Sequence, residues 1–598
     1  MSAVSADEAA EAPQACDDSR RLPGPNRWFG SPGVELTALT AAAQDDGALA
    51  AWAQRVRGLC AALGWPDPQP HAQRHAGGAT LAFAAPEDTL LTATEVNEWA
   101  WERCAAALGA LATAGVAPTQ PQSDDLATLA PHFAARAEAE RSRPLLRLKA
   151  AARAHGVPVF DDDDHVSLGA GSGSHGWPRA ALPLPMDVPW PQLHDLPTVL
   201  VTGSNGKTTT ARLVAAMAAA AGRVAGCCST EGVSVGGTTV HAGDYAGPAG
   251  ARAVLRHPAV QFAVLETARG GILRRGLAVQ RADAAVVTNV SADHLGEYGV
   301  VSVADIAQAK LAVAHTLLGS PSGTLVLNAG DALLMAAAAQ LPQVQALQAA
   351  GRVALFAREA DAPALVALRA AGGSSCGVRG GHLVLQRGGA VDDLGPLAHM
   401  PLTLGGAAAF NVDNIAAAVL AATAAGLPAD ALRHTLANFG AQPQDNPGRL
   451  ERWTHRGATV LVDYAHNPDG LAQLLGVARA LRPRRLGLLL GQAGNRDDAA
   501  ISELARTAAA AAPDRVVLKE LPAMRRGRAP GEVPALLRTG LLAGGLAPEC
   551  VAQEDDEEAA ARSLLAWAAS GDVIVLPVHT AAVRARLAAT LGGPRTAG

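Results

Sequence analysis

The residues best suited to chemistry run from Thr198 to Thr210, where the chain reads TVLVTGSNGKTTT. A short β-branched strand, a glycine-containing turn and an alanine-rich helix follow one another here, in the order that holds a phosphate group. Loop N–H groups and the helix start face the anion, Lys207 adds a positive charge, and the Thr208 hydroxyl can reach a metal ion. Val201 stands where the full pattern has its first glycine. We predict a nucleotide loop made of Gly203, Ser204, Asn205, Gly206, Lys207, Thr208 and Thr209.

Polar residues also follow two later strands. Glu266 ends the strand FAVLE, and His294 follows the strand AAVVT. Lys310 lies sixteen residues beyond His294, in the helical stretch VADIAQAKLAVAH. Ligands of an open parallel sheet bind at the carboxyl ends of its strands, so these side chains should converge on the nucleotide loop. Together with Thr208, Glu266 and His294 are suitable magnesium ligands, although each taken singly could be an ordinary cap or loop residue.

Composition sets the class of protein. The 598 residues suggest about three to four domains at roughly 150 residues each. Hydrophobic residues make up 49% and aromatic residues 3%, so we expect several cores built from Ala, Leu and Val. The net charge of -6 without a basic block argues against nucleic acid as a partner. No apolar run reaches membrane-spanning length and the N-terminus is acidic, so we expect a cytoplasmic protein without a membrane partner.

The seven cysteines are scattered and none forms a CxxC pair, which favours reduced thiols over disulfides or a zinc site. The acidic run Asp161–Asp164 could bind a metal, but consecutive carboxylates in a turn are more often solvated.

The elements that position the nucleotide loop indicate an α/β protein. We expect a disordered tail over 1–21, an α+β N-terminal domain over 22–170 and a linker over 171–197. A central ATP-binding domain with a mostly parallel sheet is expected over 198–445, and a Rossmann-like C-terminal domain over 446–598. Central strands are predicted at 262–266, 284–288, 324–327 and 353–356, and C-terminal strands at 460–464, 486–490, 515–518 and 573–576. N-terminal helical patterns run over 49–63, 93–111 and 134–154.

Four strings together resemble the central ATPase domain of Mur ligases: TGSNGKTTT, LETARGGILRRG, VVTNVSADHLG and the lysine of ADIAQAK. More narrowly, they are similar to the Mur-ligase-like half of cyanophycin synthetase, for which ETARGGILRRG is the most specific string. The resemblance implies a P-loop fold with ATP and Mg²⁺ as cofactors. In this family the lysine at the position of Lys310 is often carbamylated, so the resemblance implies the same modification here. Carbamylation turns a poor metal ligand into the anionic oxygen donor that Mg²⁺ prefers. With Glu266 and His294, it would hold a second Mg²⁺ beside the γ-phosphate.

The resemblance continues through LTLGGAAAFNVDNIAAAVLAA, NPGRLERW and VLVDYAHNPDG. It implies that Asn414 contacts adenine, Arg449 the γ-phosphate and Asp463 the ribose, while His466 contacts the nucleotide or the acceptor. The resulting catalytic set is Lys207, Glu266, His294, Lys310 and Arg449, and the metal ligands are Thr208, Glu266, His294 and Lys310. The loops GQAGNRDD and ELPAMRRGRAPGEVP resemble those that bind the incoming amino acid. The substrate candidates are Arg269, Asn467, Arg496, Asp497, Arg526, Arg528 and Glu532.

The strings GPNRW and VPVFDDDDHVSLGAG look like the two ends of the N-terminal domain of cyanophycin synthetase. In that family an ATP-grasp domain follows, whereas only about thirty residues here separate SLGAG from the nucleotide loop, leaving no room for it. The stretch ATEVNEWAWERC stands where the family can carry a histidine-rich helix, which puts chemistry tied to those histidines in doubt.

Family resemblance therefore implies an ATP-dependent, ADP-forming acid–amino-acid ligase. It would join an amino acid such as Arg or Lys to a carboxylate of an Asp-containing acceptor through an acyl phosphate. Two alternatives remain: a catalytically silent partner or scaffold of a full cyanophycin synthetase, and a cell-wall-type Mur ligase. Relatives assemble into dimers or tetramers, so a homo-oligomer is expected, with association with a full synthetase as a further partner.

Overall fold

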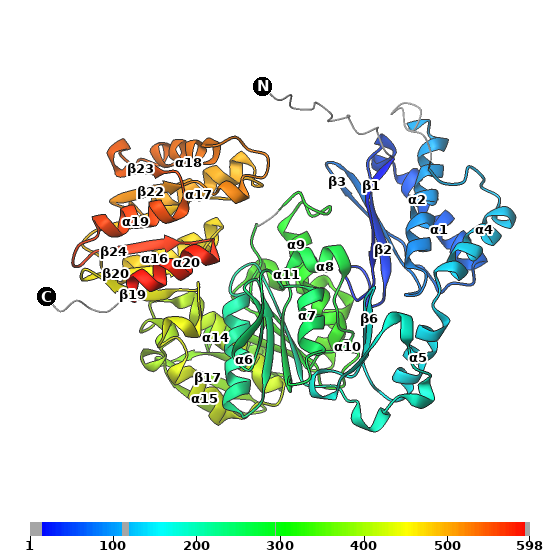
Figure 1. Cartoon of the computed structure of the whole chain (residues 1–598), viewed down its shortest axis with the longest axis horizontal. Coiled ribbons are helices and arrows are strands. Elements are labelled where there is room, and N and C mark those ends of the chain that lie inside the picture. The colour runs from blue at the N-terminus through cyan, green and yellow to red at the C-terminus, as the bar shows by residue number, and fades with distance from the viewer. Residues whose placement is uncertain (1–14, 111–118, 293–294, 593–598) are drawn as a thin grey trace.

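The structure is a computed structural model, and it describes residues 15–110, 119–292 and 295–592. Three α/β units succeed one another along the chain (Figure 1). The N-terminal unit lies on one side of the central unit and the C-terminal unit on the other. No helix in the described ranges is both long and apolar enough to cross a bilayer.

The N-terminal unit is a four-stranded antiparallel sheet covered by helices, in the strand order β1-β2-β4-β3. The strands are β1 (Cys16–Leu22), β2 (Gly33–Ala38), β3 (His71–His75) and β4 (Gly78–Ala84), and the helices that cover them are α1 (Asp46–Ala62), α2 (Leu90–Ala107) and α4 (Leu126–Glu140). The next helix, α5 (Arg143–Ala154), packs in a separate core with Val166 and Leu168. Trp52, Trp99 and Trp101 are buried in its core, so this unit departs from the aliphatic composition expected for the whole chain.

Three expectations need correction here. Residues 16–21, expected in a disordered tail, form most of β1, because it pairs with β2 and Arg20 is buried beside Glu35. Residues 1–14 lie outside the described residues. The helical pattern over 134–154 is two helices, since α5 begins anew with a proline in its first turn. The stretch 171–197 is packed rather than a free linker, because Val188, Leu193 and Leu196 are buried.

A small three-stranded sheet joins the N-terminal and central units, with strands β5 (Val159–Asp161), β6 (His165–Leu168) and β7 (His175–Pro178). The acidic run that connects β5 and β6 pairs with arginines. Asp161 lies 3.3 Å from Arg179, and Asp162 forms an ion pair with Arg256 at 2.5 Å. Within the described ranges, no cluster of three or more His, Cys, Asp or Glu side chains could hold a metal ion. Asp162 thus holds the small sheet against the central unit, while Asp161 pairs beside the small sheet itself.

The central unit is built on one eleven-stranded sheet, in the order β11-β10-β9-β12-β8-β13-β14-β15-β16-β17-β18. The seven neighbouring strands β9, β12, β8, β13, β14, β15 and β16 pair in parallel. The antiparallel strands β10 and β11 form one edge of the sheet, and β17 and β18 form the other. The strands are β8 (Thr198–Thr202), β9 (Ala225–Ser229), β10 (Gly232–Val235), β11 (Thr238–Ala242), β12 (Phe262–Glu266), β13 (Ala284–Val287), β14 (Thr324–Asn328), β15 (Val353–Glu359), β16 (Ser374–Arg379), β17 (His382–Arg387) and β18 (Ala390–Pro396).

Helices cover both faces of this sheet, which explains why its inner strands are continuous apolar runs. On one face lie α6 (Lys207–Ala220), α14 (Ala409–Ala424) and α15 (Ala429–Asn438). On the other face lie α7 (Pro248–Leu255), α8 (Arg269–Arg275), α9 (Val303–Leu311), α10 (His315–Leu318), α11 (Ala332–Gln340), α12 (Pro342–Ala349) and α13 (Pro363–Ala370). The four predicted central strands are confirmed as β12, β13, β14 and β15.

The C-terminal unit is a six-stranded sheet in the order β19-β20-β24-β21-β22-β23, parallel except for the edge strand β19. Its strands are β19 (Glu451–His455), β20 (Ala458–Asp463), β21 (Leu486–Leu490), β22 (Arg515–Lys519), β23 (Val551–Glu554) and β24 (Val573–Pro577). Its helices are α16 (Pro468–Ala480), α17 (Asp498–Ala510), α18 (Glu532–Ala543), α19 (Glu557–Trp567) and α20 (Ala581–Leu591). The predicted Rossmann-like arrangement and its four strands are confirmed, and so is the α/β fold class.

Candidate active site

The predicted nucleotide loop leaves β8 near the middle of the central sheet and ends at the start of α6. Gly203 and Gly206 both have positive φ angles, and a Cβ at either would lie within about 2 Å of Thr288 Oγ1 or Asn414 Oδ1. Only glycine therefore fits at these two positions. The Asn205 N–H donates to Asn289 Oδ1 at 2.9 Å, so the residue that follows β13 holds the loop in place.

A large cavity opens at this loop, with a volume of about 1050 Å³. All three units line it. The predicted residues on its wall are Gly203, Ser204, Asn205, Gly206, Lys207, Thr208, Thr209, Glu266, Arg269, Lys310, Asn414, Arg449, Asp463, His466 and Arg496. His294 lies outside the described residues. Most of the site residues predicted from the sequence therefore lie around one cavity, because the sheet topology makes the strand ends that carry them neighbours.

Glu266 is the buried acid of this cavity, with 1% of its surface exposed. Its Oε2 accepts a hydrogen bond from Thr208 Oγ1 at 2.9 Å, while its Oε1 has no hydrogen-bond partner among the described residues. Burial raises the pKa of this carboxyl, and the positive charge of Lys207 opposes that shift. An unpartnered buried carboxylate oxygen beside a threonine hydroxyl fits a hard cation such as Mg²⁺. Lys310, also buried, lies on the same cavity wall.

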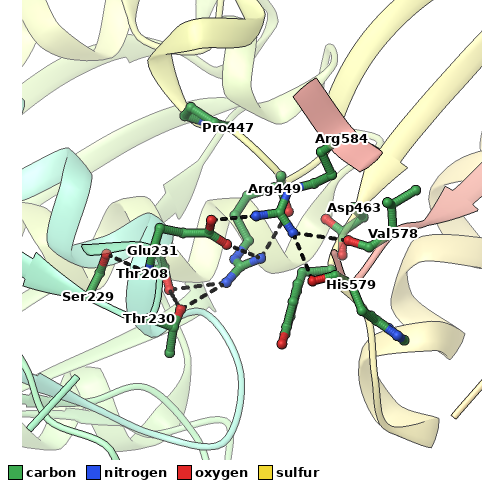
Figure 2. A network of polar contacts seen from close by, with 12 residues as sticks. Thr208, Ser229, Thr230, Glu231, Pro447, Arg449, Asp463, Val578, His579 and Arg584 are labelled. Atoms are coloured by element: carbon green, nitrogen blue, oxygen red, sulfur yellow. Dashed lines mark hydrogen bonds and ion pairs between the residues drawn. The ribbon is translucent and has the colours of Figure 1, made fainter. Parts of the chain in front are cut away.

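Arg449 reaches the loop from the C-terminal unit. Its Nη2 lies 3.4 Å from Thr208 Oγ1 and 3.3 Å from Thr230 Oγ1 (Figure 2). Its guanidinium carbon sits 4.6 Å from the centre of the Tyr464 ring, a cation–π distance. This arrangement puts a cation where a phosphate on the loop would need one.

Asp463 and Asn414 flank the loop. The Asp463 carboxylate accepts from the N–H groups of Leu450 and Ala465 at 2.7 and 2.8 Å, so it holds the residue that follows Arg449 against the loop that follows β20. Burial raises its pKa, against the charge of Arg449. Asn414 donates to Asn411 Oδ1 at 3.1 Å on α14. Both residues face the cavity, as their predicted nucleotide contacts require.

Five predicted substrate residues are not on the cavity wall: Asn467, Asp497, Arg526, Arg528 and Glu532. Asn467 caps α16 and its Nδ2 donates to Asn205 Oδ1 at 3.0 Å, which ties the C-terminal unit to the nucleotide loop. Asp497 caps α17. Arg528 forms ion pairs with Asp498 and Glu532 at 2.7 and 2.6 Å. In this arrangement these side-chain contacts of Asn467, Asp497, Arg528 and Glu532 hold helix starts and loops in place.

The cavity also contains residues that the sequence did not single out. Tyr464 and His579 come from strand ends of the C-terminal unit, and Tyr464 stood unused inside the string VDYAHN. The N-terminal unit contributes Asp18, Ser19, Arg20 and Arg21 from β1, together with Leu91 and Thr94. No motif marks these last residues, because β1 reaches the cavity only through the packing of the N-terminal sheet on α8.

Comparison with known proteins agrees with this geometry. Residues 201–422 match the Mur ligase middle domain, and residues 448–577 match the Mur ligase, glutamate ligase domain. A UDP-N-acetylmuramoyl-L-alanyl-D-glutamate–2,6-diaminopimelate ligase of Parasynechococcus marenigrum is 30% identical over 63% of this chain and 71% of its own length. The chain belongs to the Mur ligase family. This Mur ligase also resembles cyanophycin synthetases, at 35% identity for that of Crocosphaera subtropica and 36% for that of a Synechocystis species.

The match to the cyanophycin synthetases covers 64% and 62% of this chain but only 42% and 41% of those proteins. This Mur ligase thus spans about two fifths of the length of these relatives. Among solved structures, E. coli FolC in complex with ADP covers 67% of this chain and 90% of its own, with 20% identity and a TM-score of 0.47.

Proposed function

We propose that this Mur ligase is an ATP-dependent amide ligase that joins an amino acid, such as Arg or Lys, to a carboxylate of an Asp-containing acceptor. The observation that carries the proposal is the shared cavity. It combines a glycine loop with Lys207 at a helix start, the buried Glu266 beside Thr208, and Arg449 from a second unit. That combination suits phosphoryl transfer, in which positioning and charge stabilisation supply most of the rate.

In the proposed reaction an acceptor carboxylate oxygen attacks the γ-phosphorus of ATP, the bond to the β,γ-bridging oxygen breaks, and ADP leaves. The amine of the incoming amino acid then attacks the acyl phosphate carbon, and phosphate leaves as the amide forms and the amine loses its proton. Lys207 and Arg449 offset the repulsion between the two anions. Thr208 and Glu266 would hold Mg²⁺, with Lys310 and His294 as further predicted ligands; the ion would supply Lewis-acid stabilisation of phosphate charge.

Support for an acidic acceptor comes from the N-terminal side of the cavity. Arg21 of β1 and Arg275 of α8 are exposed on this wall, and neither side chain has a partner among the described residues. Arg274, their neighbour, is exposed too, and within the described part of the chain it donates only to the Gly270 carbonyl, at 3.2 Å. Cations from two units that converge without carboxylate partners suit an anionic ligand. The five-part division of the chain, a homo-oligomeric state, association with a full synthetase and a cytoplasmic setting stay proposals.

The test is phosphate release from Mg-ATP, measured over single amino acids with Asp-containing peptides as acceptors. We expect release that requires both an amino acid and an acceptor, and that Lys207→Ala abolishes. Release of ADP and an amide product, identified by mass spectrometry, would name the amino acid. Retained ATP binding without turnover in any mixture would contradict the proposal and favour the silent-partner alternative. A dependence on UDP-linked acceptors would favour the cell-wall alternative.

A further inference from the structure

Glu231 joins the central unit to the C-terminal unit. It occupies the turn between β9 and β10, where its N–H donates to Ser229 Oγ at 3.2 Å. Its carboxylate crosses to the other unit and meets two arginines (Figure 2). One oxygen lies 3.9 Å from Arg449 Nη1, and the other forms an ion pair with Arg584 of α20.

Arg584 is held in a defined position. Only 8% of its surface is exposed, and its Nη1 donates to the Val578 carbonyl at 3.1 Å. Gly448 makes room for it, since a Cβ at that residue would lie 2.9 Å from the Arg584 Nε. Its guanidinium carbon lies 5.6 Å from the centre of the Tyr464 ring, which Arg449 also contacts. Burial and these contacts hold the Arg584 guanidinium in one position.

The charges of Glu231, Arg449 and Arg584 depend on one another. A carboxylate beside the nucleotide loop would repel a triphosphate, and Glu231 alone would bind Arg449 as its nearest cation. Arg584 supplies a second cation that engages this carboxylate from the side away from Thr208 (Figure 2). Arg449 is then left with a long contact to Glu231 and keeps its position over Tyr464 and toward Thr208.

We propose that Glu231 and Arg584 are positioning residues, and that Arg584 neutralises Glu231 so that Arg449 is free to bind the γ-phosphate. This inference rests on the proposed function, because it assumes that a nucleoside triphosphate occupies the loop. It assigns a role to the last helix of the described chain, α20. It also makes γ-phosphate binding depend on the packing of the C-terminal unit, because Arg584 and Glu231 meet only when the two units are packed together.

The charge relation predicts a rescue. In Arg584→Met, Glu231 should capture Arg449 and weaken binding of the nonhydrolysable triphosphate analogue AMPPNP by about tenfold, which is about 1.4 kcal/mol. Binding of ADP, which lacks the γ-phosphate, should change less than about threefold. Glu231→Gln in the Arg584→Met background removes the capturing charge, so AMPPNP affinity should return to near the wild-type value. Arg584→Lys, which keeps the charge, should lose little.

Isothermal titration calorimetry of the full chain with Mg²⁺ and either nucleotide measures these affinities, and a melting curve for each variant monitors folding. Arg586→Met is the matched control, because Arg586 lies on the same helix, is exposed and pairs with Glu558. Equal losses for ADP and AMPPNP, or a double variant no better than Arg584→Met, would overturn the inference. Nucleotide binding without ligation would contradict the proposed function while leaving this test intact. A wild type that binds neither nucleotide would contradict both.

Discussion

Glu266 is the residue on which the proposed metal site depends most. Its carboxylate is buried, bonded to Thr208 on one side and without a described partner on the other. Glu266→Gln keeps the shape but removes the charge, so phosphate release should fall at least about 100-fold and need more Mg²⁺. Because burial raises the pKa of Glu266, the wild type should also need more Mg²⁺ as the pH falls.

A magnesium titration of turnover at two pH values tests this. The control is Glu359→Gln, since Glu359 also ends a parallel strand, β15, but is exposed and does not line the cavity. The same magnesium response in Glu266→Gln and wild type would refute the assignment of Glu266 as a metal ligand.

At the scale of elements, α19 is anchored by a buried ion pair. Glu557 begins this helix and lies 2.5 Å from Lys519 Nζ at the end of β22, with side chains 4% and 0% exposed. His579 also donates its N–H to Glu557, at 2.7 Å. Glu557→Gln leaves the Lys519 charge buried without its partner, and we expect a loss of about 3–5 kcal/mol in the free energy of unfolding.

Urea unfolding monitored for the C-terminal unit measures that loss. Glu558→Gln changes the next residue of the same helix, whose ion pairs lie at the surface, and should leave stability nearly unchanged. Similar unfolding midpoints for the two variants would show that the Lys519 charge is stabilised by other groups.

Elements with strong apolar patterns were predictable, and polar ones were not. The inner strands β12 and β21 have the bounds predicted for them, because their apolar runs FAVL and LGLLL make up all of each strand except Glu266. Strand β1, CDDSRRL, gave no such signal, because one of its two buried positions is Arg20, which pairs with Glu35, and only the other, Leu22, is apolar. Strand β17, which lies between β16 and the edge strand β18, was also missed, although glycine pairs at 380–381 and 388–389 mark turns on both sides of it.

The site shows the same division. Lys207 comes after β8 and Glu266 ends β12, two strands that their apolar runs reveal in the sequence, and the sheet brings such strand ends together. Arg584 and Glu231 are 353 residues apart and come from different units, so only the packing of those units makes them neighbours. Arg528 and Glu532 were predicted from their loop, yet they pair with each other at 2.6 Å across the turn that leads into α18.

At the scale of the whole molecule, the joint between the N-terminal and central units contains a histidine that resists protonation. His315 lies beside Gly30, and its Nε2 is buried without a described partner. Burial lowers its pKa to about 4, below the ordinary value of 6.5. The unfolded chain therefore binds a proton at this residue between those values while the folded chain does not. Its contribution to stability is full above pH 6.5 and is lost as the pH falls toward 4.

His315→Gln removes that titration, so its melting temperature should fall less than that of the wild type between pH 7 and pH 4.5. Differential scanning fluorimetry across this range gives the comparison, and His132→Gln, at an exposed histidine, should follow the wild type. Parallel curves for His315→Gln and wild type would mean that acid weakens the molecule through other groups.

The N-terminal unit should matter to catalysis through its wall of the cavity. Arg21 comes from a different unit than the nucleotide loop and has no described partner, so its loss removes a charge without breaking a contact. For Arg21→Ala we expect the KM of an acidic peptide acceptor to rise about tenfold, the effect of one charged hydrogen bond. The KM of ATP and kcat should stay unchanged, and added salt should weaken acceptor binding in the wild type more than in the variant. Arg57→Ala, an exposed arginine of α1 outside the cavity, is the control. If Arg21→Ala instead lowers kcat with an unchanged acceptor KM, the arginine acts on the packing of the units and the acceptor binds elsewhere.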